Sequence, residues 1–248
     1  MMQLKISNLL NRGLRILPPR EAYELWANTY DNQAGNALLF AEERYVAPLV
    51  DALDMSGASV VDFGCGTGRY LRRALSKGAR LILGIDFSRN MLRVASEKYG
   101  NETLSLIQSD LRQLPLSPDM FDIGISTLAL GSLPDLQEPI SEMCRVLKRG
   151  GTLLISEFHP VADGRGWKRT FCLDSHGGPQ GTVAVQNYSR PLDDYVKAFE
   201  SNKMEVEIKA EPAIDDSMEP FFLKAGMARE YREALGTPIL FILRLRKR

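Results

Sequence analysis

The sequence predicts an α/β protein whose doubly wound, mostly parallel sheet carries helices on both faces. Its 248 residues suffice for one large domain of this kind with a sizeable apolar core. Between residues 59 and 157, short apolar runs alternate with amphipathic segments, which is typical of βαβ units. The first run leads directly into glycines at alternate positions, as expected where a strand turns sharply into a helix.

The apolar runs are the expected strands, and the segments between them are the expected helices. Strands are expected at 60–63, 81–85, 104–108, 121–126 and 152–157. Helices are expected at 69–76, 90–99 and 138–147. The segment KRGG at 148–151 is expected to end the last helix, because cations favour a helix C-terminus and glycine commonly follows it.

Three regions flank or follow this core, which spans 56–158 of an expected single domain. Residues 1–55 are expected to form a helical N-terminal cap, in which Ile6, Leu10, Leu14 and Leu17 recur at helical spacing before a break at Pro18. Residues 159–190 are irregular and glycine-rich, which favours an insertion or lid. Residues 191–248 are expected to form a helix at 192–201 and the strands MEVEIKA and PILFILRLRKR.

The composition argues against several classes of protein. The 31 basic and 31 acidic residues balance, so no overall field favours nucleic acid or a membrane surface. Cys65, Cys144 and Cys172 form no C-x-x-C pair, which argues against a disulfide framework and a zinc site and fits a cytoplasmic location. No apolar run approaches the roughly 20 residues that span a bilayer, and the N-terminus lacks a secretory signal. Its amphipathic helix is expected to pack on its own domain, and contact with a membrane surface is the alternative.

The stretch VVDFGCGTGRYL, residues 60–71, points to an anionic or nucleoside ligand. A strand that ends in glycines before a helix presents backbone N–H groups and a helix dipole, although several nucleotide-binding families share this feature. Gly64, Gly66 and Gly68 alternate, and Arg69 stands where the dinucleotide fingerprint has its last glycine. Asp86 ends the next apolar run, where a carboxylate can accept both hydroxyl hydrogens of a ribose.

Four ordered segments resemble the motifs of class I S-adenosylmethionine-dependent methyltransferases, in the small-molecule branch (methyltransferase type 11) that includes quinone-biosynthesis enzymes. They are VVDFGCGTG, LGIDFSRNML, SDLRQLPLSPDMFDIGIS and LKRGGTLLISEF, within residues 59–157. WANTYDNQAG, residues 26–35, is similar to the N-terminal helix and loop of that branch. The resemblance implies a Rossmann-like, seven-stranded sheet, S-adenosylmethionine as cofactor and S-adenosylhomocysteine as product.

The resemblance also implies roles for single residues. The glycines would wrap the methionine part, Asp86 would hold the ribose, and Asp110 would face the adenine amino edge. The whole implied cofactor-binding set is Tyr30, Asp62, Gly64, Cys65, Gly66, Gly68, Asp86, Phe87, Met91, Asp110, Leu111, Ser126, Thr127 and Leu128. Phe87, Met91 and Leu128 fit the apolar core equally well, Cys65 fits a small buried residue, and Asp62 can orient the loop without touching ligand.

His159 is the expected general base, because it follows the fifth run at the carboxyl edge of the sheet and histidine titrates near neutral pH. Glu157 can orient it or cap the strand. The alternative is that His159 ends the strand at a turn made by Pro160. No metal is expected, since His159, Asp163, Asp174 and His176 lack ligand spacing with strong precedent.

One departure affects the expected chemistry. Many small-molecule relatives carry a histidine after the fourth strand in a pattern like L-x-H-L-x-D, whereas this chain reads ALGSLPD with Gly131 and Ser132 there. The N-P-P-Y and D-P-P-Y tetrapeptides that mark methylation of protein or DNA nitrogens are also absent from the sequence. Nucleic acid is therefore not the expected partner, in agreement with the balanced charge.

The expected acceptor site lies under a cover made of Tyr23–Tyr30 and 160–190. Trp167, Phe171 and Tyr188 can contact an apolar acceptor or pin the cover to the core. Lys168, Arg169 and Arg190 can bind a carboxylate or phosphate, or remain solvated.

The sequence thus predicts methyl transfer from S-adenosylmethionine to the oxygen, nitrogen or carbon of a small organic acceptor. Alignment of the nucleophile behind the sulfonium methyl supplies much of the catalysis, and a carboxylate needs no base. The alternatives are a catalytically silent cofactor-binding subunit and a nicotinamide-dependent oxidoreductase. The acceptor and the oligomeric state are left open.

Overall fold

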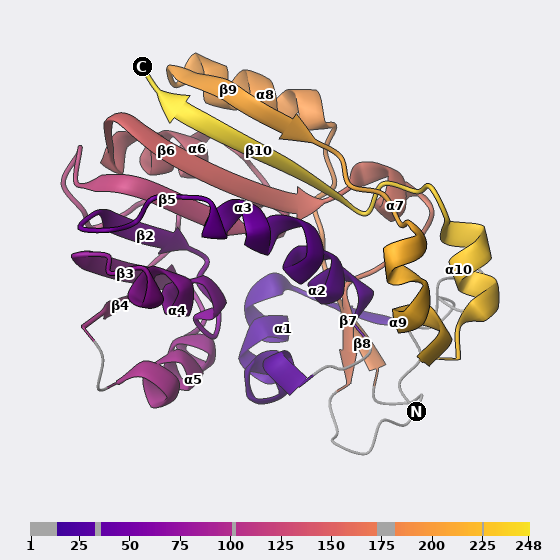
Figure 1. The fold of residues 1–248 in the computed structure, drawn as a ribbon. Coiled ribbons are helices and arrows are strands. Elements are labelled where there is room, and N and C mark those ends of the chain that lie inside the picture. The colour runs from indigo at the N-terminus through magenta and orange to yellow at the C-terminus, as the bar shows by residue number, and fades with distance from the viewer. Residues whose placement is uncertain (1–13, 33–35, 101–102, 173–181, 225) are drawn as a thin grey trace.

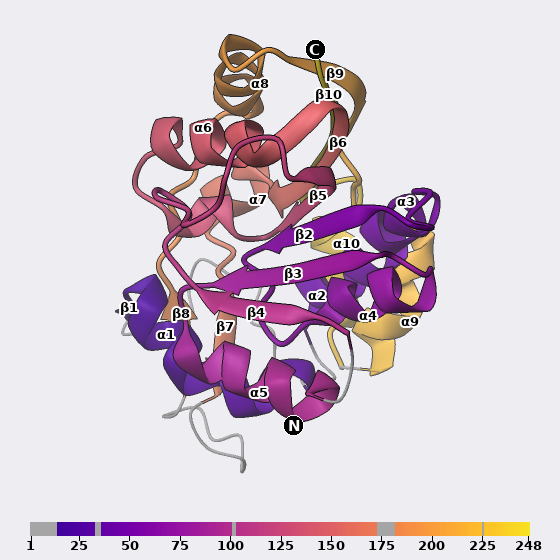
Figure 2. The same cartoon turned by 90° about the vertical axis from the view of Figure 1, so that its left-hand side faces the viewer.

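The predicted fold class is confirmed by a computed structural model, which describes residues 14–32, 36–100, 103–172, 182–224 and 226–248. Its larger sheet has seven strands in the order β4-β3-β2-β5-β6-β10-β9 (Figures 1 and 2). The strands from β4 to β6 pair in parallel, and β10 is antiparallel to both β6 and β9. The sheet is therefore mostly parallel with an antiparallel edge.

Most elements of the core lie within one or two residues of their predicted bounds. The strands are β2 (Ser59–Phe63), β3 (Leu81–Asp86), β4 (Ser105–Gln108), β5 (Phe121–Thr127), β6 (Leu147–Phe158), β9 (Met204–Ala210) and β10 (Leu240–Lys247). The helices along the larger sheet are α3 (Ala47–Asp51), α4 (Arg69–Ser76), α5 (Arg89–Tyr99), α6 (Gln137–Val146) and α8 (Leu192–Ser201). Two short helices near the C-terminus are α9 (Glu219–Lys224) and α10 (Ala228–Ala234).

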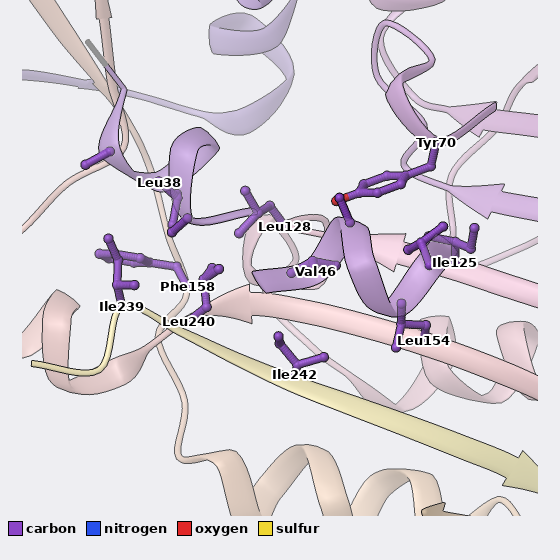
Figure 3. Close-up of a cluster of buried hydrophobic side chains, with 14 of the residues drawn as sticks. Leu38, Val46, Tyr70, Ile125, Leu128, Leu154, Phe158, Ile239, Leu240 and Ile242 are labelled. Carbon is purple, nitrogen blue, oxygen red and sulfur yellow. The ribbon is translucent and has the colours of Figure 1, made fainter. Parts of the chain in front are cut away.

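Alternate residues of the strands bury themselves in two different cores, one on each face of the sheet. Val60 packs in a cluster with α3, α4, α9 and α10, whereas its neighbour Val61 packs in a cluster with α6 and α8. Figure 3 shows the first cluster, where Ile125, Leu154 and Ile242 of adjacent strands face the helices. Burial on both faces explains why these strands read as continuous apolar runs rather than as alternating ones.

The segment KRGG does not end a helix, so that prediction was wrong. Helix α6 stops at Val146, and Leu147 already has extended backbone angles and begins β6. Residues 148–151 lie within that strand, where the register to β5 shifts between Phe121 and Ile123. The irregular start of β6 leaves no uninterrupted apolar run there, and this hides the strand from a pattern search.

A second, smaller sheet forms the cap, and the sequence did not predict it. Strand β1 (Arg15–Leu17) pairs in parallel with β8 (Thr182–Val185), which pairs antiparallel with β7 (Thr170–Cys172). The expectation of an all-helical segment 1–55 was therefore wrong at β1, and the segment 159–190 contains two strands. It also contains the short helix α7 (Pro160–Gly164). The spacing of Ile6 and Leu10 lies outside the described residues, as do Asp174 and His176.

The rest of the N-terminal region is helical, as predicted. It comprises α1 (Pro19–Trp26), the 3-10 helix η1 (Ala27–Asn32), α2 (Ala37–Ala41) and the π-helix η2 (Glu42–Val46), which leads into α3. In both views α1 lies with β7 and β8, far from β9 (Figures 1 and 2). Within the part of the chain that the structure describes, no helix combines the length and hydropathy needed to cross a bilayer.

Candidate active site

A cavity of about 290 Å³ lies where the parallel strands end and the cap begins. One wall follows the carboxyl ends of β2, β3, β4 and β5, through Gly64, Asp86, Asp110 and Thr127. Strands β2 and β5 are neighbours from which the sheet grows in opposite directions. Open α/β sheets bind their ligands at such a switch point. The opposite wall comes from the N-terminal segment and from the segment around Arg169.

The three alternate glycines have different surroundings. A Cβ atom on Gly64 would lie 2.6 Å from the Cβ of Ala129, and one on Gly68 would lie 2.7 Å from the Tyr99 ring. Gly66 lines the cavity with φ at +54°, and a Cβ atom there would meet nothing within 4 Å. The outer glycines are thus required by packing within the protein, whereas Gly66 leaves space for a ligand to approach its backbone.

Asp86 ends β3 in the cavity wall and is only 6% exposed. Its two carboxylate oxygens each accept one backbone hydrogen bond of 2.8 Å, from the N–H groups of Gly66 and Ser88. Burial raises the pKa of this carboxyl to about 6, while the two N–H donors act in the opposite direction. The group is therefore mostly ionised at neutral pH, is fixed in position, and retains lone pairs for further donors.

The wall next to Asp86 offers an apolar face and a charged edge. Phe87, Met91 and Leu111 line the cavity there, and Asp110 lines it beside Arg112. The Asp110 carboxylate accepts hydrogen bonds of 2.7 and 3.0 Å from the Arg112 guanidinium, which lowers its pKa. A flat ring fits between these apolar side chains with its polar edge toward Asp110.

Four members of the implied cofactor set lie behind this wall rather than on it, namely Asp62, Cys65, Gly68 and Ser126. Asp62 is 2% exposed, and its Oδ2 atom has no hydrogen-bond partner among the described residues. Burial, followed by the neighbouring Asp86 charge, raises the pKa of Asp62 to about 8. Cys65 is buried, and its sulfur lies with the side chains of Leu71 and Leu106 around the space that a Cβ atom at Gly84 would need.

Leu128 joins the two walls in an unusual conformation. Its φ of 55° lies in the left-handed region, which costs about 1–2 kcal/mol for a residue with a Cβ atom. Its N–H donates to the Ser156 carbonyl at 2.8 Å, and its carbonyl accepts from the Arg169 guanidinium at 2.9 Å. Its side chain packs near Leu38 and Val46 (Figure 3). Backbone strain of this kind clusters at ligand sites.

Aromatic side chains build the cap wall. The ring of Trp26 stacks on Phe171 with centroids 4.8 Å apart, and it meets the edge of Tyr30 at 4.9 Å. Tyr23 and Tyr30 line the cavity, whereas Trp26 and Phe171 are buried behind them. The two parts of the predicted cover therefore form one aromatic cluster, in which Phe171 pins the cap.

Polar contacts attach the cap to the wall that is formed by the carboxyl ends of the strands. Glu24 of α1 accepts the N–H groups of Arg89 and Asn90 at the start of α5, at 2.7 and 3.0 Å. Asp31 of η1 accepts the Thr67 hydroxyl at 2.8 Å, next to the glycines. These contacts hold the N-terminal segment over the two turns that carry Gly66 and Asp86.

His159 and Glu157 do not line the cavity. The Nδ1 atom of His159 accepts the Val161 N–H at 3.1 Å, so this tautomer carries its proton on Nε2, which lies 3.0 Å from Glu211 Oε2. His159 is the N-cap of α7, in agreement with the alternative interpretation of a strand that ends at Pro160. Its role as a base receives no support from this geometry.

Glu157 lies under the 3-10 turn η3 (Leu130–Ser132), where its Oε1 atom accepts the Leu130 N–H. Burial raises its pKa to about 7, and the charge of Arg169 opposes that shift. A Cβ atom on Gly131 would lie 2.6 Å from Asn187 Oδ1 and 2.9 Å from Glu157 Oε2. A side chain at Gly131 would therefore displace these two groups. The histidine of the pattern corresponds to Ser132, which lines the cavity.

Sequence reasoning missed part of the cavity lining. The residues concerned are Pro18, Pro19, Arg20, Arg112, Ala129, Leu133 and Pro134. Residues 129–134 directly follow the strand end that carries Leu128, so the strand-edge rule extended by six residues would have found three of them. The lining by residues 18–20 depends on the cap sheet and has no signal in the sequence.

Comparisons with known proteins identify the family of the central part of the chain. Residues 61–155 match the family described as Methyltransferase domain. The chain is 34% identical over 142 residues to malonyl-[acyl-carrier protein] O-methyltransferase of Buchnera aphidicola, covering 55% of this chain and 52% of that protein. It is 34% identical over 139 residues to demethylmenaquinone methyltransferase of Thermobifida fusca, covering 53% of this chain and 57% of that protein. The chain spans about half the length of these curated relatives.

Solved structures share the fold. An S-adenosylmethionine-dependent methyltransferase from Mesorhizobium loti matches with a TM-score of 0.64 at 22% identity, over 82% of this chain and 97% of that one. The sheet order, the glycine turn and Asp86 thus define a class I methyltransferase fold. Residues 61–155 are therefore a methyltransferase domain, similar in sequence to the O-methyltransferase and the demethylmenaquinone methyltransferase named above.

Proposed function

We propose that this protein transfers the methyl group of S-adenosylmethionine to a small organic acceptor held between the sheet edge and the cap. The observation that carries the proposal is the pairing of Gly66 and Asp86 in one cavity wall, with an open backbone beside a fixed, buried carboxylate. The names of the similar proteins, which include an O-methyltransferase and a quinone methyltransferase, support a small-molecule acceptor.

The residues of the sheet wall fit the cofactor part by part. Asp86 would accept the two ribose hydroxyl groups through its remaining lone pairs. Phe87, Met91 and Leu111 would enclose the adenine, with Asp110 at its amino edge. Gly64, Gly66, Thr127 and Leu128 would lie along the methionine part. Asp62, Cys65, Gly68 and Ser126 would support that wall from behind.

When bound, S-adenosylmethionine supplies an electrophilic methyl group on a sulfonium. The chain's own contribution is to orient the acceptor and exclude water, and well-oriented reactants gain at most about 7–11 kcal/mol this way. Tyr23, Tyr30 and Ser132 line the side of the cavity where the acceptor would sit. Within the described cavity lining the carboxylates are those of Asp86 and Asp110, both engaged with other groups.

The binding part of the proposal is tested by calorimetry with S-adenosylhomocysteine. Asp86→Ala removes the charge-assisted bonds to ribose and is expected to weaken binding by about 2–4 kcal/mol. Asp54→Ala, which changes an exposed aspartate far from the cavity, is the matched control and should bind as the wild type does. Equal affinity of Asp86→Ala and wild type would remove the ribose assignment.

The transfer part is tested with cell extract, the protein and S-adenosylmethionine. A compound heavier by one CH₂ group, found by mass spectrometry together with S-adenosylhomocysteine, is the expected result. Binding of S-adenosylhomocysteine without any methylated product would instead favour the silent cofactor-binding subunit. Thermal stabilisation by NAD rather than by S-adenosylhomocysteine would favour the oxidoreductase.

A further inference from the structure

Three basic residues were expected to bind a carboxylate or phosphate of the acceptor or to remain solvated. They lie in different surroundings. Lys168 pairs with Asp163 at 3.1 Å and does not line the cavity. Arg190 also lies outside the cavity lining, and it donates to two backbone carbonyl groups at 2.6 and 3.0 Å. Arg169 lines the cavity and is 6% exposed.

The Arg169 guanidinium is buried, with few partners among the described residues. It donates one hydrogen bond, from Nη1 to the Leu128 carbonyl, and lies 5.5 Å above the Tyr23 ring. Among the described residues it forms no ion pair, although the buried carboxylates of Glu42 and Glu157 act on it from beyond that distance. Guanidinium has five N–H donors, and one of them forms a hydrogen bond with the part of the chain that the structure describes, at a position where an unpaired charge is costly.

The groups around Arg169 complete a small polar site in an otherwise apolar wall. Ser132 and Tyr188 line the cavity with it, and Leu133 adds an apolar side. The Tyr23 hydroxyl is buried beside the Ser132 side chain, and it forms no hydrogen bond of standard geometry with the described residues. An unused phenol donor beside an unpaired guanidinium suits one ligand group above others, namely a planar anion with two oxygen acceptors.

We infer that the methyl acceptor is a carboxylic acid whose carboxylate binds the Arg169 guanidinium beside Tyr23. This inference rests on the proposed function. Arg169 and Tyr23 lie outside residues 61–155, the part that matches the general methyltransferase domain. The cofactor is common to that domain, whereas the acceptor differs between relatives, so an arginine outside the domain serves the acceptor. Its position under the Leu128 carbonyl places the acid next to the methionine end of the cofactor site.

A first experiment asks which carboxylate Arg169 binds, because S-adenosylhomocysteine carries one of its own. Calorimetry compares S-adenosylhomocysteine with 5′-methylthioadenosine, which lacks the amino-acid part, in wild type and Arg169→Gln. The expected result is that both affinities stay within about twofold of wild type. A loss of about tenfold or more for S-adenosylhomocysteine alone would assign Arg169 to the cofactor and overturn the inference.

A second experiment tests the acceptor with matched acids and amides. The protein saturated with S-adenosylhomocysteine is titrated with benzoate, phenylacetate and hexanoate and with the corresponding neutral amides. At least one acid is expected to bind about tenfold or more tightly than its amide. Arg169→Gln should abolish this preference, and Arg169→Lys, which keeps the charge but not the planar donors, should reduce it.

Two controls separate the possible failures. Lys168→Gln removes a neighbouring cation that does not line the cavity, and it should keep the preference for the acid. Circular dichroism checks that Arg169→Gln remains folded without its bond to Leu128, and Arg169→Lys gives a second reading if it does not. Equal binding of every acid and its amide by the wild type would overturn the inference alone. Failure of the wild type to bind S-adenosylhomocysteine would overturn the proposed function.

Discussion

The two walls of the cavity differ in their charge, in the elements that form them and in how far apart those elements lie in the sequence. The sheet wall is acidic, with Asp86 and Asp110 in it, and it is built from turns that each follow one strand. The cap wall is aromatic and carries the buried cation Arg169. It combines two distant segments, since Arg15 of β1 pairs with Val183 of β8. We attribute this difference to the proposed roles of the two walls, with a general cofactor site on the sheet and a particular acceptor site on the cap.

The largest effect is expected from removal of the Trp26 ring, because it tests whether the cap wall depends on its aromatic cluster. Trp26 is 1% exposed and stacks on Phe171, so Trp26→Ala is expected to destabilise the cap by about 3–5 kcal/mol. Hydrogen exchange should rise in β1 and β8 while β2 and β3 keep their protection. Leu25→Ala, at a 52% exposed position of the same helix, is the control. If both variants behaved alike, the cap wall would not depend on its aromatic cluster.

The protonation of Asp62, which lies behind the sheet wall, can be tested by the pH dependence of unfolding. Because burial raises the folded-state pKa of Asp62 to about 8, the folded protein holds a proton there that the unfolded chain releases. This contribution to stability is complete below the unfolded pKa and is lost as pH rises through about 8, at about 1.4 kcal/mol per pH unit in between. Asp62→Asn should therefore flatten the fall in stability between pH 5 and pH 8.

Urea unfolding at several pH values measures this slope, and Asp54→Asn serves as the exposed control. An unchanged slope in Asp62→Asn would show that Asp62 ionises in the folded protein as it does in the unfolded chain. Asp62 would then carry a negative charge at neutral pH and would add to the charge of Asp86 in the sheet wall.

The smallest effect is expected at His159, which belongs to neither wall. Both of its ring nitrogens are engaged, with Val161 and Glu211, so His159→Gln should leave the rate of methyl transfer within about twofold of wild type. Loss of the N-cap of α7 should cost about 0.5–2 kcal/mol of stability. A rate loss of about a hundredfold with unchanged stability would restore His159 as a general base.

The sheet wall was largely predictable because its signals are local. Val60 and its neighbours reveal β2, the next glycines reveal the turn, and Asp86 stands at the end of the following run. Each inference uses residues close in the chain. Ten of the fourteen implied cofactor residues line the cavity. The other four, such as Ser126, lie behind its wall, and the sequence alone does not distinguish them from the ten.

The cap wall could not be predicted because its elements are short and pair over long distances. Strand β1 has three residues, and its apolar Ile16 and Leu17 also fit a helical pattern. Nothing in the sequence near Arg169 distinguishes it from Lys168, yet one is buried at the cavity and the other is paired outside it. The orientation of His159 was equally hidden, since it depends on Glu211 from a different part of the chain.

The Glu24 carboxylate, which holds the first N–H groups of α5, has a thermodynamic consequence. Helix α5 starts just after Asp86. The same short turn would therefore bind the nucleoside and also attaches the cap. Stabilising this turn should favour both nucleoside binding and attachment of the cap. Each of these two equilibria should increase the other by the same factor. A bound nucleoside should thus slow proteolytic cleavage around α1. Loss of the Glu24 hydrogen bonds to α5 should weaken nucleoside binding by the same factor.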